Sequence, residues 1–169
     1  TISREGVFCQ EEKIKAVKNW PTPTTTKELQ SFLGFASYYR RFVKDFSKKA
    51  GCLHDLVNAS GGGKKKSVRI TRLWQEQHEK ALESLKVALT SSPVLQYADY
   101  SKPFLLETDA SHEGLGAILS QEQADGTVRV IAYASRRLRP SEQNTSRYSS
   151  FKLEMLAVKW AVTEKFRHY

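Results

Sequence analysis

Residues 103–120, PFLLETDASHEGLGAILS, are the stretch from which the fold of this chain is predicted. Phe104 to Asp109 combines aromatic, aliphatic and β-branched side chains, which suit a half-buried strand. Ser111 to Gly114 has the composition of a turn. Gly116 to Leu119 then supplies a second strand, so this stretch predicts a β-hairpin that starts with an acidic strand.

A third strand follows the hairpin. Asp125-Gly126 predicts a tight turn into Thr127 to Ala134, and three strands joined by short loops form an antiparallel meander. The two-residue period of a strand places Leu105, Glu107 and Asp109 on one face, and Phe104, Leu106 and Thr108 on the other. Asp109 is therefore expected late in the first strand, on the more polar face.

A helix is predicted in SSFKLEMLAVKWAV, residues 149–162. Its apolar stripe repeats with helical spacing and consists of Leu153, Leu156, Ala157, Trp160 and Ala161. We expect this stripe to pack on the meander. Glu154 lies about 100° from Leu153 on the helix, at the edge of the stripe, and is predicted to lean toward Asp109. Two carboxylates are a natural start for a Mg²⁺ site.

The first 58 residues predict a helical lobe that follows the end of a strand pair at Thr1 to Phe8. Glu11 to Trp20 reads as a short helix that is ended by prolines. Thr25 and Glu28 form a capping box for the next helix. The buried stripe of that helix is expected to contain Leu29, Phe32, Leu33, Ala36 and Tyr39. Phe46 to Val57 completes the lobe.

Gln30, Gly34 and Tyr38 share a second face of the same helix, at i, i+4 and i+8. A glycine inside a helix costs about 1 kcal/mol relative to alanine, so another backbone is expected to approach Gly34 closely. That backbone belongs either to a neighbouring helix or to a nucleic acid. The spacing alone leaves both interpretations open.

The rest of the chain divides at changes of composition. Residues 59–73, with the run ASGGGKKK, are expected to form a flexible basic linker. Residues 74–102 are expected to contain a connecting helix, with Ala81, Leu82, Leu85, Ala88 and Leu89 at helical spacing, followed by an extended crossing segment after Pro93. The meander and its helix occupy residues 103–169. The predicted class is α+β.

Composition limits the kind of protein. A chain of 169 residues with 40% hydrophobic residues can bury a core. Cys9 and Cys52 lie far apart, and the four histidines, which we expect at the surface, lack metal-ligand spacing, so neither a disulfide framework nor a zinc site is indicated. No apolar run reaches membrane-span length, and the N-terminus lacks the pattern of a signal peptide. We expect an intracellular protein, cytoplasmic or nuclear, with no contact to a membrane.

The net charge of +9 is unevenly distributed. Residues 1–92 contain 17 Lys and Arg against 9 Asp and Glu, whereas residues 93–169 contain 10 against 9. A basic lobe beside a near-neutral module suits a protein that grips a phosphate backbone. Lysines that merely solvate helix faces are the alternative.

These motifs also carry a family resemblance. TDASHEGLGAILSQ, IAYASRRL and YSSFKLEMLAVKWAVTEKFRHY resemble the beginning of the ribonuclease H domain in Pol polyproteins of gypsy-class LTR retrotransposons. GVFCQEEKIKAVKNWPTPTTTKELQSFLGFASYYRRFVKDFSKKA resembles the reverse-transcriptase thumb that precedes that domain. The resemblance implies a thumb-like lobe over residues 1–58 and the first half of a ribonuclease H-like domain over residues 103–169.

The resemblance also implies site residues. Gln30, Gly34 and Tyr38 match a thumb track that lies in the minor groove of the template-primer, and the basic residues Arg40, Arg41 and Lys44 are expected to clamp phosphates. Asp109 and Glu154 match two of the four carboxylates that hold two Mg²⁺ ions in a complete ribonuclease H. Asp99, Glu107, Glu113 and Asp125 match none of the four. We therefore expect weak or no Mg²⁺ binding and no catalysis by this chain alone.

Two functions follow from this resemblance. The first is a nucleic-acid-binding fragment of a retroelement reverse transcriptase and ribonuclease H, which copies RNA into DNA and hydrolyses the RNA of RNA/DNA hybrids. The second is an inactive, host-adopted remnant that binds nucleic acid or protein. A sheet of three strands also leaves two outer edges open, so we expect either partial disorder near Ala134 to Ser146 or pairing of an edge with a partner chain or a second copy.

Overall fold

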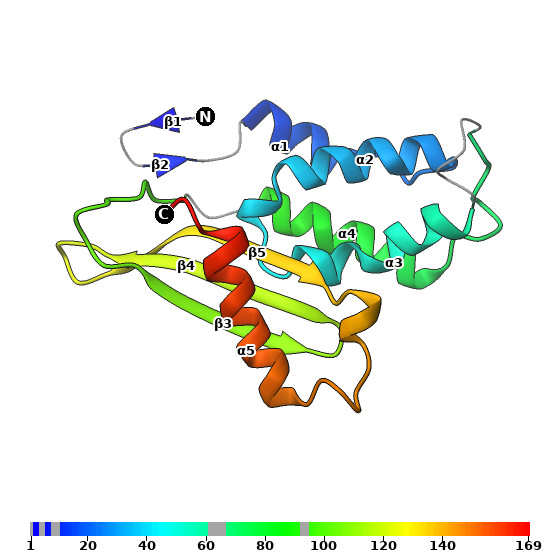
Figure 1. Ribbon diagram of the computed structural model, residues 1–169. Helices are drawn as coiled ribbons and strands as arrows, with labels where there is room; N and C mark the ends of the chain where they lie inside the picture. The colour runs from blue at the N-terminus through cyan, green and yellow to red at the C-terminus, as the bar shows by residue number, and fades with distance from the viewer. Residues whose placement is uncertain (1, 4–5, 8–10, 61–66, 92–94) are drawn as a thin grey trace.

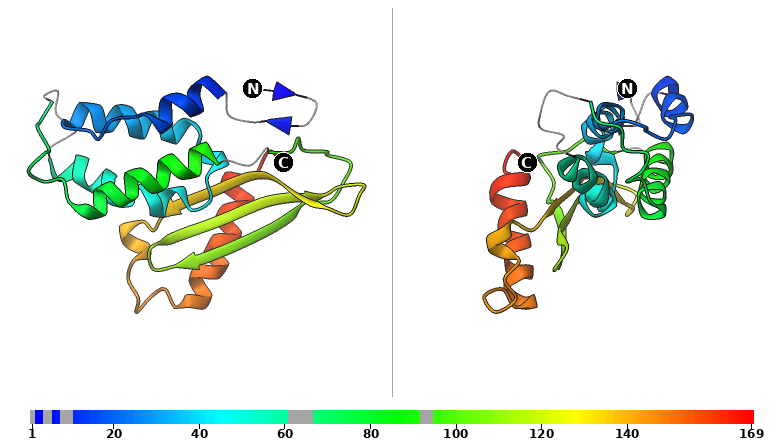
Figure 2. Two further views of the ribbon diagram at one scale, coloured as in Figure 1. Left: turned by 180° about the vertical axis from the view of Figure 1, so that it is seen from behind. Right: turned by 90° about the vertical axis from the view of Figure 1, so that its right-hand side faces the viewer.

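A helical lobe packs beside a three-stranded sheet that carries one helix on its opposite face (Figures 1 and 2). The computed structural model describes residues 2–3, 6–7, 11–60, 67–91 and 95–169. The predicted α+β class, with helices first and an antiparallel meander after them, is confirmed.

Among its described residues, the lobe contains four α-helices and a 3₁₀ turn at Arg40–Phe42, preceded by a short strand pair, β1 (Ile2–Ser3) and β2 (Gly6–Val7). The helices are α1 (Glu11–Lys18), α2 (Thr26–Tyr38), α3 (Phe46–Ala59) and α4 (Glu76–Thr90). Their apolar residues form one core, and the stripe predicted for α2 is buried except at half-buried Tyr39. The period of 3.6 residues therefore predicted the interior of the lobe correctly.

The start of α2 differs from the predicted capping box. The Thr25 hydroxyl accepts a hydrogen bond from the Glu28 backbone N–H at 3.3 Å, as predicted. The Glu28 carboxylate, however, accepts bonds from the backbone N–H and the hydroxyl of Thr24, at 2.8 and 3.0 Å. Both bonds favour the ionised carboxylate and lower the pKa of Glu28.

The second half of the expected linker is a fixed part of the lobe. Residues 61–66, which include the Lys64–Lys66 run, lie outside the described residues. Val68 and Ile70 exchange backbone hydrogen bonds with Thr24 and Thr26, at 2.8 and 2.9 Å. Ile70 is fully buried in the core of the lobe. Composition missed this because one buried isoleucine anchors an otherwise polar segment.

Helix α4 also belongs to the core of the lobe, where Leu82 and Leu85 are fully buried. Its first turn contains His78, which is buried and accepts a hydrogen bond from the Gln75 backbone N–H through Nδ1 at 2.9 Å. The expectation that all four histidines lie at the surface is therefore wrong for His78. Burial lowers the pKa of this imidazole, which favours the neutral form that can accept the bond.

The sheet has the predicted order. Strands β3 (Leu105–Ser111), β4 (Gly114–Glu122) and β5 (Val128–Arg137) pair antiparallel in sequence order. Gly126 has a positive φ of 77° in the β4–β5 turn, a conformation that favours glycine. A bulge between Leu119 and Ser120 shifts the register of β5.

Helix α5 (Ser150–Trp160), which continues as a π-helical turn over Ala161–Lys165, covers one face of the sheet. Its predicted stripe is buried, with Leu156 half-buried, against Leu115, Ala117 and Leu119 of β4. An ion pair holds the chain between β5 and α5: Arg136 contacts Glu142 at 2.6 Å, and both side chains are largely buried. Residues 134–146 are thus described and bonded, so the expected disorder there is not observed.

The opposite face of the sheet receives the lobe along β5. Arg40 donates to the Ser135 carbonyl, the Ser47 N–H donates to the Ser135 hydroxyl at 2.9 Å, and Arg137 pairs with Asp55. The crossing segment is held by buried Gln121, which bonds both backbone groups of Asp99. The expectation of two open edges is therefore wrong for β5. Among the described residues, β3 has no strand on its outer side.

Candidate functional site

Asp109 lies near the end of β3, opposite Gly116 of β4. Phe104, Leu106 and Ala110 pack toward α5, so the alternate residue Asp109 projects from the other face of the sheet. Its side chain is exposed. The strand period predicted this placement on the more polar face.

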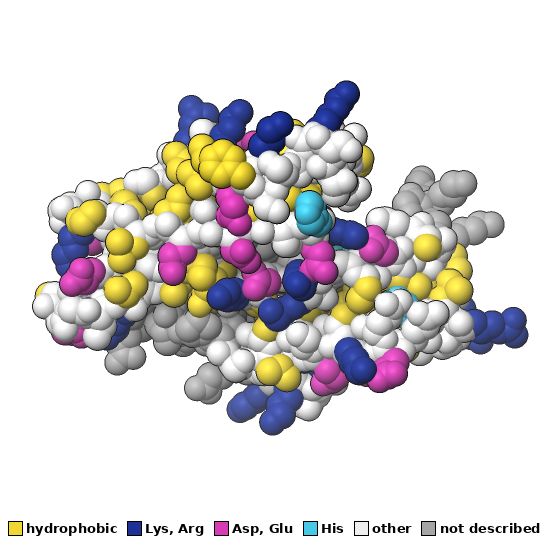
Figure 3. Space-filling model, turned by 90° about the horizontal axis from the view of Figure 1, so that it is seen from below, with side chains coloured by type: hydrophobic (Ala, Val, Ile, Leu, Met, Phe, Trp, Pro, Cys, Tyr) yellow, Lys and Arg dark blue, Asp and Glu magenta, His cyan; other side chains and the backbone are white. Residues whose placement is uncertain are grey.

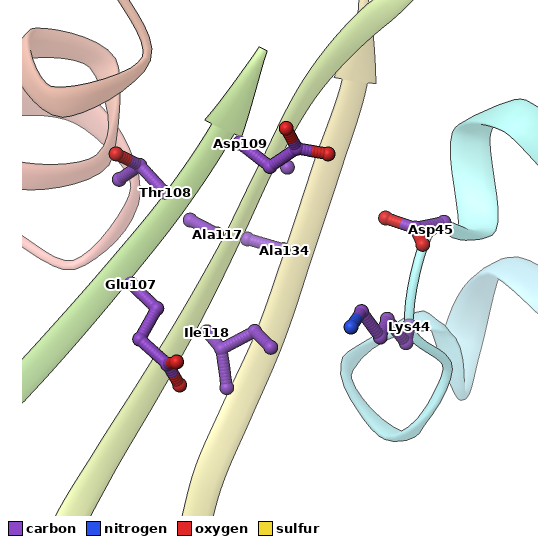
Figure 4. Close-up of a pocket in the computed structure, with 9 residues that line it drawn as sticks. Lys44, Asp45, Glu107, Thr108, Asp109, Ala117, Ile118 and Ala134 are labelled. Carbon is purple, nitrogen blue, oxygen red and sulfur yellow. The ribbon is translucent and has the colours of Figure 1, made fainter. Parts of the chain in front are cut away.

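Asp109 faces the lobe across a small cleft (Figure 4). The cavity has a volume of about 230 Å³, and its lining includes Lys44, Asp45, Glu107 and Asp109. In Figure 4 the carboxylates of Asp109 and Asp45 lie on opposite sides of this space, whereas Thr108 points to the other side of β3. Residues far apart in sequence thus contribute charges to one cleft.

Sequence reasoning missed Asp45. This residue precedes α3 and has a left-handed backbone, with φ of 56°. A Cβ atom on Gly116 would lie 3.3 Å from Asp45 Oδ1, so a glycine in β4 leaves room for the loop to approach the sheet. The position of Asp45 at the start of a helix could have been recognised, but its distance from β4 depends on the docking of the lobe.

Lys48 links the lobe to the β3–β4 turn. Its Nζ lies 2.7 Å from Glu113, and a second cavity of about 120 Å³ beside this pair is also lined by Asp45 and Asp109. The hydrogen bond to Glu113, then its charge, raises the pKa of Lys48, and the charges of Asp45 and Asp109 act in the same direction. Acidic and basic side chains likewise lie intermixed on the underside of the molecule (Figure 3).

Glu154 is exposed on α5, next to buried Leu153. It comes from the helix that covers one face of the sheet, whereas Asp109 projects from the other face, and Glu154 lines neither of the two cavities at Asp109. The predicted meeting of Asp109 and Glu154 around one cation stays a prediction. Within the described ranges, no group of three or more His, Cys, Asp or Glu residues could hold a metal ion.

Gln30, Gly34 and Tyr38 lie on the solvent-facing side of α2. Tyr38 is 79% exposed, and apart from the adjacent backbone of α2 no atom of the described residues comes within 4 Å of a Cβ built on Gly34. Tight packing of another helix on Gly34, one of the two interpretations left open by the sequence, is therefore not observed. Gln30, Gly34 and Tyr38 thus form an exposed strip along α2, with the glycine between an amide and an aromatic side chain.

The three predicted phosphate-binding residues differ in their surroundings. Arg40 is half-buried, donates to Ser135 and lies over the Phe46 ring, with its Cζ 5.7 Å from the ring centroid. Arg41 and Lys44 are exposed. Lys165, from the C-terminal turn, was missed: burial lowers its pKa, and the charges of Arg40 and Arg41 lower it further. Lys165 comes near Arg40 and Arg41 only through the tertiary fold, so no local sequence pattern could have indicated it.

The comparisons with known proteins agree with this architecture. A family model described as an RNase H-like domain found in reverse transcriptase matches residues 74–169. The chain belongs to this family. It is 40% identical over 164 residues to the retrovirus-related Pol polyprotein from transposon gypsy of Drosophila melanogaster. That match covers 95% of this chain and 15% of the polyprotein, so the chain spans a small part of its relative.

Solved structures share the fold. The foamy viral protease-reverse transcriptase in complex with dsDNA matches with a TM-score of 0.80 and 23% identity, over 99% of this chain and 32% of that chain. The same enzyme in complex with an RNA/DNA hybrid matches with a TM-score of 0.75 and 24% identity, over 95% and 20%. These likenesses extend to the helical lobe.

Within the described residues, no helix is long and apolar enough to cross a membrane.

Proposed function

We propose that this chain is a nucleic-acid-binding part of a retroelement reverse transcriptase and ribonuclease H, and that its lobe holds a duplex without sequence preference. The parent protein would copy RNA into DNA and hydrolyse the RNA strand of RNA/DNA hybrids. The exposed strip of α2 carries this proposal. Its open Gly34 lets a backbone approach, and the minor groove that would lie against it is poor in sequence information.

Phosphate contacts would flank this strip. Arg41 and Lys44 are exposed on the segment that follows α2, so their charges are available to a polyanion. Arg40 donates one N–H to the Ser135 carbonyl. We assign it two roles, one in holding the lobe against the sheet and one in contacting a phosphate of the duplex. The foamy viral enzymes that share this fold are bound to dsDNA and to an RNA/DNA hybrid, which supports a duplex as the ligand.

The carboxylate site is the second part of the proposal. Asp109 and Glu154 would hold Mg²⁺ through oxygen ligands, which this cation prefers. When bound in pairs, such ions activate water and stabilise the leaving oxygen of a phosphodiester. Asp109 is exposed beside the cleft, so its donor chemistry and access fit the ion. Two carboxylates leave most ligand positions to water, and we therefore expect weak binding of Mg²⁺.

The open edge of β3 would take a partner chain.

Titration of a labelled RNA/DNA hybrid by fluorescence anisotropy at several salt concentrations tests duplex binding. We expect log affinity to fall linearly with log salt, with a slope of about −0.9 for each phosphate contacted. Tyr38→Ala should weaken binding at every salt concentration without changing the slope. Arg41→Gln should reduce the slope by about one contact. Ser31→Ala, also exposed on α2, is the matched control.

Absence of binding at low salt would contradict the proposal. A cleavage assay with the same hybrid and Mg²⁺ tests the carboxylate site. We expect no cleavage by this chain alone, because two of the four carboxylates are unmatched. Cleavage of the RNA strand that Asp109→Asn abolishes would show that other residues complete the cage. Binding without cleavage fits both a fragment and an adopted remnant.

A further inference from the structure

Three cations meet where the lobe joins the sheet module, which consists of β3–β5 and α5. Arg40 and Arg41 belong to the 3₁₀ turn that follows α2, and Lys165 ends the π-helical turn that follows α5. In Figures 1 and 2 the C-terminal end of α5 lies beside the segment that joins α2 to α3. The charges of both arginines act on Lys165. Two segments far apart in the chain thus bring like charges together.

The fold holds both arginines without neutralising them. Arg40 donates to the Ser135 carbonyl of β5, and its Cζ lies 5.7 Å from the centroid of the Phe46 ring. The Cζ of Arg41 lies 5.9 Å from the centroid of the buried Phe42 ring. Aromatic rings and a carbonyl oxygen attract a cation but carry no net charge. A guanidinium has five N–H donors, so the carbonyl leaves most of those on Arg40 to a ligand.

Lys165 is half-buried, and the fold disfavours its charge. Burial lowers the pKa of this ammonium, and the charges of Arg40 and Arg41 lower it further. No ion pair within the described part of the chain includes any of the three cations. The neighbouring Glu164 pairs with Arg139 instead, at 3.4 Å. A bound anion would therefore stabilise this arrangement.

The donors and their position suit a phosphate. Guanidinium groups bond two phosphate oxygens at once, whereas an ammonium adds a compact point charge. Arg40 and Arg41 also follow closely after Tyr38, the last residue of the exposed strip on α2. A duplex that lies along this strip has its phosphate backbone beside the end of the helix.

The cleft beside Asp109 does not offer an equivalent site at its lysine. Lys48 already pairs with Glu113 at 2.7 Å, and Asp45 and Asp109 line the same cavity. These carboxylates would repel an anion. The three cations at the junction, in contrast, have no carboxylate partner among the described residues.

We propose that Arg40, Arg41 and Lys165 form one phosphate site across the junction of lobe and module, and that its ligand is a backbone phosphate of the bound duplex. Lys165 is the contribution of the module, which the lobe by itself lacks. The proposal rests on the duplex binding proposed above. A phosphate held by both regions would also strengthen the docking of the lobe on β5.

Titration of the labelled RNA/DNA hybrid tests this site. Lys165→Gln removes the charge from the module and should weaken binding about tenfold at low salt. The slope of log affinity against log salt should become less steep by at most about 0.9, because one phosphate is involved. Lys165→Arg keeps the charge and should bind like the original chain. Lys159→Gln, at an exposed lysine of α5, is the matched control and should leave the affinity unchanged.

Stability measurements separate ligand binding from a structural role. Lys165→Gln relieves repulsion from the two arginines, so its thermal midpoint should equal or exceed that of the original chain. The double variant Arg41→Gln, Lys165→Gln should weaken binding by less than the product of the two single losses, because both residues hold the same phosphate. Independent losses would show two separate contacts and would overturn the shared site.

NMR of lysines that carry isotope-labelled methyl groups identifies the source of the phosphate. The pKa of Lys165 should lie below those of the exposed lysines and should rise when the hybrid is added, because an anion favours the charged form. Inorganic phosphate at the same phosphate concentration should raise it much less. An equal rise with inorganic phosphate would mean a small phosphate ligand in place of the duplex.

Two negative results have different meanings. If the chain binds the hybrid and Lys165→Gln binds it equally well, the site at the junction is overturned while the proposed function stands. If the original chain binds no hybrid at low salt, both are overturned.

Discussion

The helical lobe and the sheet with α5 solve the problem of burial in different ways. The lobe surrounds its core with four helices, so its fully buried residues, such as Phe32 and Leu82, need no further partner. The sheet module buries one face under α5 and part of the other under the lobe. Within the described residues, the edge of β3 and the exposed α5 residues Phe151, Met155 and Val158 stay uncovered. The core of the lobe is thus closed on all sides by its own helices, whereas the sheet module keeps exposed apolar residues and an unpaired strand edge among the described residues.

The junction between the two regions is largely polar. Arg40 and Ser47 donate its hydrogen bonds to Ser135. Two ion pairs, Arg137 with Asp55 and Lys48 with Glu113, also cross it, beside a small apolar contact of Phe42 with Leu95. Polar junctions contribute less to stability than apolar cores do. The two regions should therefore respond separately to changes in their cores.

Core truncation should produce the largest effects. Phe32→Ala should lower the free energy of unfolding by about 4 kcal/mol and Leu153→Ala by about 3 kcal/mol, since each leaves a cavity at a fully buried site. Hydrogen exchange should show faster exchange in α1–α4 for the first variant and in β3–β5 and α5 for the second. Equal acceleration in both regions would show that the junction couples them strongly.

Glu142→Gln should cost about 2 to 3 kcal/mol in urea denaturation, because it leaves the largely buried Arg136 guanidinium without its anion. Glu164→Gln is the control. The Glu164 carboxylate pairs with Arg139 at 3.4 Å, and both side chains are more than half exposed, so its loss should cost less than about 0.5 kcal/mol. Similar costs for both variants would contradict the special role of Glu142.

Acidification should destabilise the two regions at different pH values. Burial lowers the pKa of His78 in the lobe, so its contribution is present above the ordinary histidine range, about 6.5, and is lost as pH falls below it. The hydrogen bonds from Arg136 lower the pKa of Glu142, so its contribution is lost only below the ordinary carboxyl range, about 4.3. Unfolding midpoints measured against pH should show both steps. His78→Gln should reduce the first step, to which His54 also contributes because burial lowers its pKa as well.

Gly34→Leu should separate stability from binding. Leucine is a better helix former, and the space around Gly34 is open, so the lobe should gain about 0.8 kcal/mol. The added side chain would project into the strip on α2 that we assign to the duplex, and hybrid affinity should fall about tenfold. A stabilised variant with unchanged affinity would remove α2 from the binding surface.

Arg137→Ala should have the smallest effect. Arg137 and Asp55 form an ion pair that is about half exposed, so its loss should cost about 0.5 kcal/mol and the cost should shrink with added salt. The test is urea denaturation at low and high salt. A cost that salt leaves unchanged would mean that packing of the Arg137 stem, not its charge, holds the junction.

Much of the fold could be predicted because its elements follow local rules. The turns around Ser111 and Asp125 set the meander, and the helical periods around Leu29 and Leu153 set the buried faces of α2 and α5. The errors arose where a specific hydrogen bond or the packing around one residue, and not the periodic pattern, decided the outcome. His78 was expected at the surface but is buried in the first turn of α4. The Glu28 carboxylate was expected to accept a hydrogen bond from the Thr25 backbone but accepts from the backbone N–H and the hydroxyl of Thr24.

For the candidate site, the sequence by itself determined which face of β3 carries Asp109 and which side of α2 carries Gln30, Gly34 and Tyr38, because side-chain direction follows the period of the backbone. Only the tertiary structure decided what lies opposite them. The docking of the lobe on β5 brought Asp45 to the cleft beside Asp109 and Arg40 to Ser135. Such contacts depend on the shapes and charges of two finished surfaces, which no single stretch of sequence contains.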